Sequence, residues 1–241
     1  MTYGMTDAEM DRSQPVTPPL PAQTERIVMD VAIGDYAQVQ VTAPCGLASP
    51  AGLIGELDEP NTFYAGERRS ASLVWFGGGW VEYRVPYRLP AGARPVSLEV
   101  RAEICSDAPG YNDDWPSDIT LWINNCDVGT WCCPGDFGGR QGRFTPPWWD
   151  VRDTQFGLLK RWRITAEGAF LDEAHLSTIT IDDLALSGSE GEKEITLRIG
   201  IKSNAVHVGG LNLFGVGWGD HAQNLALILE SAPALPDGSP P

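Results

Sequence analysis

Three segments of the chain alternate apolar and polar side chains with a period of two, at residues 81–88, 97–104 and 195–202. Successive side chains of a β-strand point to opposite faces of a sheet, so each segment is predicted to be a strand with one buried face. An amphipathic helix would instead need apolar residues three and four positions apart. The predicted core contains apolar positions from these segments and from residues 119–121, namely Val81, Val85, Val100, Ile104, Ile119, Leu121, Leu197 and Ile199.

Shorter apolar runs indicate further strands. Gly, Pro, Asn and Asp separate these runs, which is typical of antiparallel strands joined by turns. We predict an all-β fold, an antiparallel β-sandwich of the jelly-roll type with long structured loops. One short helix is predicted at residues 154–162, where the spacing comes nearest to helical. The further strands are predicted at residues 27–33, 37–42, 72–76, 119–123, 128–131, 161–164, 177–181, 211–214 and 225–229.

The sequence predicts one domain, at residues 25–230 of the 241. Residues 1–24 and 231–241 are polar, rich in proline and without periodicity. Such segments bury too little apolar surface to offset the entropy lost on ordering. We therefore expect a disordered tail at each end of the domain.

Acidic residues outnumber basic ones, with 32 Asp and Glu against 17 Lys and Arg, which gives a formal net charge of −15 at pH 7. Affinity for nucleic acids depends on Lys and Arg that displace counterions from phosphates, so we expect no direct nucleic-acid binding by this chain. No run approaches the roughly 20 apolar residues of a membrane helix, and the N-terminus lacks the basic and apolar regions of an export signal. We expect neither membrane association nor export.

The five cysteines are Cys45, Cys105, Cys126, Cys132 and Cys133. Their number is odd and no two have CxxC spacing, so the sequence predicts neither a full set of disulfides nor a tetrahedral zinc site. No cofactor is expected. Reduced thiols are typical of the cytoplasm, where we expect the protein to reside.

Tryptophans and carboxylates are concentrated in two loops, at residues 111–118 and 132–153. A flat aromatic face can stack on the C–H face of a sugar while fixed polar groups orient its hydroxyls. The loops therefore favour sugar recognition, and the alternative is that the tryptophans only close the ends of the sandwich. The candidate ligand-binding residues here are Trp115, Asp118, Asp136, Arg140, Trp148 and Trp149.

A third polar segment, residues 204–224, contains two of the three histidines. His207, Asn212, Asp220 and His221 are candidates for hydrogen bonding to a ligand. A metal ion needs three or four convergent donors, which His207, Asp220 and His221 could supply only if their two loops meet. Hydrogen bonding is the better-supported role, and no metal site is predicted.

Motifs for catalysis are weak. Residues 135–140 are rich in glycine but lack the GxxxxGK[ST] pattern and a following helix, so nucleotide binding is not predicted. No GxSxG turn is present to support a Ser-His-Asp triad. Glycoside hydrolysis by two carboxylates stays open, and the aspartates that could form such a pair are Asp113, Asp114, Asp118, Asp136, Asp150 and Asp220.

Several long motifs resemble the C-terminal half of certain bacterial ArsR-type winged-helix transcriptional regulators. They include APCGLAS at residues 43–49, WFGGGWVEYRVP at 75–86, GTWCCPGDFGGRQGR at 129–143 and LRIGIKSNAVHVGGLNLFGVGWGDHAQN at 197–224. The resemblance covers about residues 27–229 and implies a ligand-sensing domain involved in transcription regulation. In those regulators a helical DNA-binding domain comes first. Here only about 25 polar residues precede the first predicted strand, so the resemblance implies a stand-alone relative of the sensing half.

The pattern ITLWINNCDVGTW at residues 119–131 is also similar to galactose-binding-like jelly rolls and carbohydrate-binding modules. The leading hypothesis is therefore a non-enzymatic β-sandwich that binds a small polar ligand, with carbohydrates favoured. A carbohydrate-active enzyme with paired aspartates is the first alternative. The second is a structural or oligomerising module, which could form a homo-oligomer. The predicted ligand-binding residues are Trp115, Asp118, Asp136, Arg140, Trp148, Trp149, His207, Asn212, Asp220 and His221.

Overall fold

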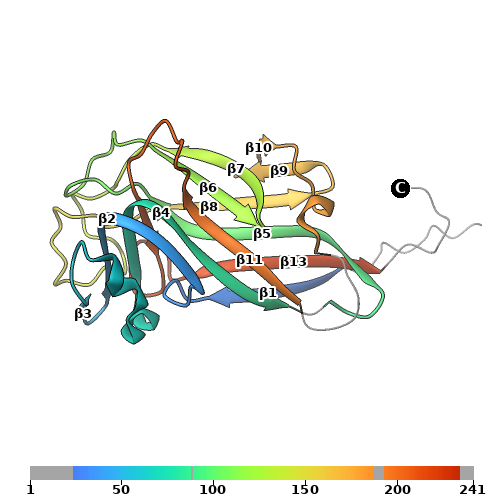
Figure 1. Cartoon of the computed structure of the whole chain (residues 1–241), viewed down its shortest axis with the longest axis horizontal. Coiled ribbons are helices and arrows are strands. Elements are labelled where there is room, and N and C mark those ends of the chain that lie inside the picture. The colour runs from blue at the N-terminus through green and yellow to red at the C-terminus, as the bar shows by residue number, and fades with distance from the viewer. Residues whose placement is uncertain (1–23, 88, 187–192, 234–241) are drawn as a thin grey trace, which may run out of the picture.

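The computed structural model describes residues 24–87, 89–186 and 193–233, which fold mainly into β-strands (Figure 1). The all-β prediction is confirmed, because the helical elements in this part of the chain are short 3-10 turns. The strands are β1 (Glu25–Val31), β2 (Gln38–Ser49), β3 (Gly52–Ile54), β4 (Leu73–Tyr87), β5 (Ala93–Cys105), β6 (Ser117–Ile123), β7 (Cys126–Cys133), β8 (Leu158–Thr165), β9 (Gly168–Leu171), β10 (Ala174–Ser177), β11 (Lys193–Ile201), β12 (Leu211–Phe214) and β13 (Leu225–Pro233). The 3-10 helices are η1 (Pro60–Tyr64), η2 (Gly66–Ser70) and η3 (Asp182–Leu184).

The strands pair antiparallel in two groups that β12 joins. One group runs β3-β2-β4-β11-β6-β7, and the other runs β1-β13-β5-β8-β9-β10. β12 pairs with β4 on one side and with β5 on the other. The outer strands β7 and β10 also approach each other, since Ser177 Oγ donates a hydrogen bond to the Val128 carbonyl. The result is a sandwich that is nearly closed into a barrel.

The core lies between the inner faces of these strands. All eight predicted core residues are buried, which confirms the period-two assignment. Three polar residues depart from it: Glu82 on β4 and Ser97 and Glu103 on β5, expected on exposed faces, are only 4%, 8% and 0% exposed. Glu82 forms an ion pair with its cross-strand partner Arg198, whose guanidinium lies over the Trp80 ring.

Three local predictions are wrong. The short helix expected at residues 154–162 is a loop followed by β8, because residues 158–164 pair along β5 and this non-local pairing decides the conformation. Of the strand expected at residues 177–181 only Ser177 is in a strand, and the chain then turns into η3. β13 continues to Pro233, since Ser231 pairs with Glu25, so the ordered domain extends beyond residue 230. The remainder of the expected tails, residues 1–23 and 234–241, lies outside the described part of the chain.

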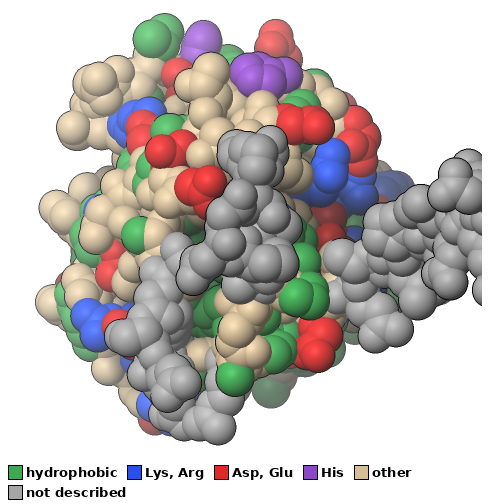
Figure 2. All heavy atoms as spheres, turned by 90° about the vertical axis from the view of Figure 1, so that its right-hand side faces the viewer, with side chains coloured by type: hydrophobic (Ala, Val, Ile, Leu, Met, Phe, Trp, Pro, Cys, Tyr) green, Lys and Arg blue, Asp and Glu red, His purple; other side chains and the backbone are tan. Residues whose placement is uncertain are grey.

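The long connections gather at one end of the sandwich, on the left in Figure 1. They are residues 106–116, 134–157 and 215–224. Figure 2 shows the opposite end, where acidic and basic side chains are interspersed. The described residues contain no helix long and apolar enough to span a membrane.

Candidate functional site

A cavity of about 510 Å³ opens among the loops that follow β3, β5 and β7. This volume is in the range of pockets that bind small molecules. Three of the predicted ligand-binding residues line it: Trp148, Trp149 and Asn212. The complete lining is Pro44, Leu53, Leu57, Trp75, Asp107, Ala108, Pro109, Gly110, Trp148, Trp149, Asp150, Asp153, Thr154 and Asn212.

Three tryptophans line one wall of this cavity, Trp75, Trp148 and Trp149, and the fully buried Trp218 packs against the last two to complete an aromatic cluster. Their rings meet edge to face, with centroids 5.5 Å apart for Trp148 and Trp149 and 5.2 Å apart for Trp149 and Trp218. Trp148 Nε1 donates to the Pro50 carbonyl and Trp149 Nε1 to the Thr154 carbonyl, each at 2.8 Å. Trp148 is nevertheless 43% exposed. The cluster therefore exposes aromatic surface to the cavity in a fixed orientation, and it does not only close the end of the sandwich.

Gly46 in β2 leaves room for the Trp75 ring at this wall. A Cβ atom on Gly46 would lie 2.2 Å from Cζ2 of Trp75, so only glycine in β2 leaves room for that indole. Leu53 and Leu57, at 46% and 53% exposure, add apolar surface at the cavity. Exposed apolar side chains that gather around a concave site are typical of ligand-binding surfaces.

The floor of the cavity is polar and hydrogen-bonded. Asn212 Nδ2, from β12, donates to the Ser106 carbonyl at 2.6 Å and lies 3.4 Å from Asp107 Oδ1. Thr154 Oγ1 lies 3.5 Å from the same amide and donates to Asp136 Oδ2 at 2.8 Å. Asp136 is fully buried and does not line the cavity. Asp136 lies behind the floor and accepts hydrogen bonds from two lining residues, Ala108 and Thr154.

Two carboxyl groups belong to this network, that of the buried Asp136 and that of the half-buried Asp107. Burial raises the pKa of Asp107 to about 8, and the negative charge of Asp136 adds to the shift. Burial also raises the pKa of Asp136 to about 6, against the effect of hydrogen bonds from Ala108 and Thr154. Asp107 Oδ2 has no hydrogen-bond partner among the described residues. An unpaired buried polar atom is costly, and among the described residues Asp107 is the one residue lining the cavity that has such an atom.

The rim carries further acids. The Arg152 side chain donates to Asp150 and lowers the pKa of that carboxyl to about 2. Burial raises the pKa of Asp153, and the charge of Asp150 raises it further. No Lys or Arg is among the described residues that line the cavity, which is therefore acidic and aromatic.

The structure places Arg140, Asp220 and His221 in a different group. Arg140 makes two hydrogen bonds to Asp220, and its guanidinium lies 3.6 Å from the centre of the Phe156 ring. The backbone N–H groups of Asp220 and His221 both donate to the buried carboxylate of Glu103. These contacts fix the loop at residues 215–224. None of the three predicted residues lines the cavity.

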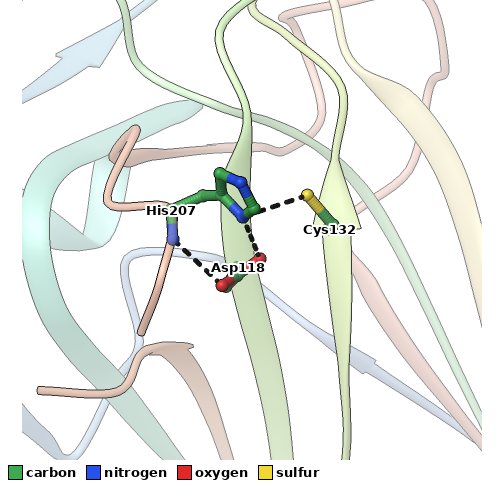
Figure 3. A group of neighbouring side chains, drawn as sticks. All are labelled: Asp118, Cys132 and His207. Carbon is green, nitrogen blue, oxygen red and sulfur yellow. Dashed lines mark hydrogen bonds and ion pairs between the residues drawn. The ribbon is translucent and has the colours of Figure 1, made fainter. Parts of the chain in front are cut away.

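Asp118 and His207 form a third group with Cys132 (Figure 3). Trp115 lies nearby, because a Cβ atom on Gly209 would come within 3.0 Å of its Cδ1 atom. The predicted side chains thus fall into separate groups, although their loops contact one another: Asn112 pairs with Asp136, and Arg140 with Asp220. The reason is that Asp118, Arg140 and Asp220 each find a partner within the protein.

Asp107 is the functional candidate that sequence reasoning missed. It lies two residues after the end of β5, next to a Pro-Gly turn, and an acidic residue directly after an apolar strand was the available signal. Trp75 was interpreted only as part of a strand. Its position in the cavity depends on the pairing of β2 with β4, which sequence spacing does not reveal.

A second concave surface, of about 580 Å³, lies over β4, β6 and β11 and includes Trp80, Trp122 and Arg198. The guanidinium of Arg198 on this surface is already paired within the protein, because it lies 2.6 Å from the Glu82 carboxylate. We therefore take the first cavity as the candidate functional site.

No protein-family model matches the chain, and no curated protein matches it significantly.

Proposed function

We propose that this protein binds a small polyhydroxylated ligand, a neutral or amino sugar, in the cavity beside the tryptophan cluster. The observation that carries the proposal is the unpaired Oδ2 atom of Asp107 in a cavity whose wall is built from fixed indole rings. Trp148 and Trp149 would stack on the ligand, and Asp107 and Asn212 would orient its hydroxyls. The resemblance of its motifs to those of ArsR-type regulators favours a sensing role for this binding.

A hydroxyl group suits Asp107 in both of its protonation states. With a pKa of about 8, the Asp107 carboxyl is mostly protonated at pH 7 and can donate to a hydroxyl oxygen. Once ionised it can accept from the same hydroxyl. The acids at the rim and the lack of lining Lys or Arg disfavour sugar phosphates and sugar acids.

A thermal-shift screen tests the proposal with three ligand sets: neutral sugars, amino sugars and sugar phosphates. A ligand at about 100 times its Kd adds about 2.7 kcal/mol to the free energy of unfolding, which raises the melting temperature visibly. We expect shifts in the first two sets and none with the phosphates. Shifts confined to the phosphates, or none in any set, would reject the proposal.

A carbohydrate-active enzyme is a second candidate, favoured by one observation. Asp107 and Asp150 line the same cavity, and their environments move their pKa values apart, to about 8 and about 2. A protonated acid beside an ionised carboxylate is the pairing that glycoside hydrolysis uses. Turnover of aryl glycosides that Asp107→Asn abolishes would establish this activity, whereas binding without turnover supports the non-enzymatic role.

A further inference from the structure

We propose that Asp118, Cys132 and His207 bind a single zinc-class metal ion, at a site separate from the aromatic cavity. Within the described residues these are the three acidic, cysteine or histidine side chains whose donor atoms all lie within 4.8 Å of one another. Figure 3 shows Asp118 and Cys132 on neighbouring strands and His207 on a separate loop, with the three side chains pointing toward one another.

The sheet aligns two of the three ligands. Asp118 on β6 and Cys132 on β7 are direct cross-strand partners, so their side chains share one face of the sheet. This juxtaposition is fixed by the strand pairing and does not depend on a metal ion.

The loop that carries His207 is held to the same strand edge. The Asp118 N–H donates to the His207 carbonyl at 2.9 Å, and the N–H groups of Val206 and His207 both donate to Asp118 Oδ2 at 3.0 Å. Because Oδ2 is used in this way, Oδ1 is directed at the histidine ring. Such hydrogen bonds to the non-ligating oxygen are how proteins orient the carboxylates that bind metals.

The two distances from His207 Nδ1 agree with tetrahedral coordination. Zinc lies about 2.3 Å from a cysteine sulfur and about 2.0 Å from an imidazole nitrogen or a carboxylate oxygen. At a tetrahedral angle, sulfur and nitrogen are then about 3.5 Å apart, and nitrogen and oxygen about 3.3 Å apart. In the structure Cys132 Sγ is 3.7 Å from His207 Nδ1, which is 3.1 Å from Asp118 Oδ1.

The same geometry argues against a Cys-His-Asp catalytic triad. In a triad the nucleophile and the acid contact opposite nitrogens of the imidazole ring. Here Cys132 and Asp118 both face Nδ1. Convergence of sulfur, nitrogen and oxygen on one point is instead the arrangement of metal ligands.

The donor set selects the class of ion. A thiolate and an imidazole favour Zn²⁺ or Co²⁺ over Mg²⁺ and Ca²⁺, which prefer oxygen ligands. Three protein ligands leave the fourth tetrahedral position for water, as in zinc sites that exchange ligands. A hollow of about 170 Å³, lined in part by Asp118, Thr130, Lys202 and Asn204, adjoins the cluster at Asp118.

Metal titration of the full-length protein under reducing conditions tests this proposal. Zn²⁺ is titrated against a chromophoric chelator, and Co²⁺ is followed by its d–d and thiolate charge-transfer absorption. We expect one ion per chain, a cobalt–thiolate band and release of the proton of the Cys132 thiol on binding. Binding that is absent, or that gives no thiolate band, would overturn the assignment.

Three variants identify the ligands. Cys132→Ser and His207→Gln should each weaken Zn²⁺ binding at least about 100-fold, because even groups outside the coordination shell cost about 10- to 100-fold when removed. Cys126→Ser, at the other end of β7, should bind as wild type. Circular dichroism and melting temperature show whether each variant is folded. Folded Cys132→Ser protein with unchanged affinity would disprove the site.

Discussion

Asp107 lines the cavity and Asp136 is buried behind it. Withdrawing two carboxyl groups from water costs free energy unless each is hydrogen-bonded. Asp136 is compensated by the Ala108 N–H, at 2.9 Å, and by Thr154. Asp107 is compensated only in part, through Asn212. The imbalance between these two acids is the main residue-level reason to assign ligand binding to this cavity.

Replacing Asp107 with Asn should change how stability depends on pH. The folded-state pKa of Asp107 is about 8, above the usual value of 3.8, so folded wild type holds a proton that the unfolded chain has lost. The contribution of Asp107 to the free energy of unfolding therefore falls as the pH rises from about 4 to 8, by at most about 1.4 kcal/mol per pH unit. We expect Asp107→Asn to gain stability relative to wild type across this range. Urea unfolding at pH 4, 6 and 8 measures it, and an equal difference at all three values would contradict the raised pKa.

At the scale of elements, β2 shapes the cavity by its approach to Trp75. Gly46→Ala should displace the Trp75 indole, because the added methyl would lie 2.2 Å from the ring. We expect weaker ligand binding together with a change in near-ultraviolet circular dichroism from the tryptophan cluster. The matched control is Gly52→Ala, since a Cβ there meets nothing within 4 Å, although its positive φ adds some backbone strain. An unchanged near-ultraviolet spectrum in Gly46→Ala would show that the ring is not held as described.

β11 lies at the centre of its sheet, between β4 and β6. Leu197 is fully buried on it, facing the core. Leu197→Ala should lower the free energy of unfolding by about 2 to 5 kcal/mol, through lost burial and the cavity left behind. Denaturant unfolding measures this loss. A cost below about 1 kcal/mol would mean that this part of the core is loosely packed.

The elements that local alternation could predict were those with one buried and one exposed face. The apolar positions of β5 and β11 are buried as expected, and β12, which is buried on both faces, was predicted with its observed bounds as a short apolar run. β9 was missed and β10 was predicted only at Ser177, because neither has an alternating pattern of its own and each depends on pairing with a neighbour. The site was predictable only in part for the same reason. Trp148, Trp149 and Asn212 could be recognised from their residue types and their loops. Asp107 and Trp75 could not, because only the pairing of the strands brings them to the cavity.

At the scale of the whole molecule, the net charge of −15 governs which partners can approach. Acidic and basic side chains are interspersed on the end seen in Figure 2. We expect no sequence-specific nucleic-acid binding, because too few cations are available to displace counterions from phosphates. A gel-shift assay at physiological salt checks this. Sub-micromolar, sequence-dependent binding would contradict it.

The central claim is that the cavity beside the tryptophan cluster binds a sugar. Isothermal titration calorimetry, with the neutral or amino sugar that gives the largest thermal shift, tests it on wild type, Trp148→Ala and Trp122→Ala. Trp148 lines the cavity and Trp122 lines the other concave surface. We predict that Trp148→Ala loses about 1 to 3 kcal/mol of binding free energy while Trp122→Ala binds as wild type. Unchanged affinity in folded Trp148→Ala, or a loss confined to Trp122→Ala, would contradict the account.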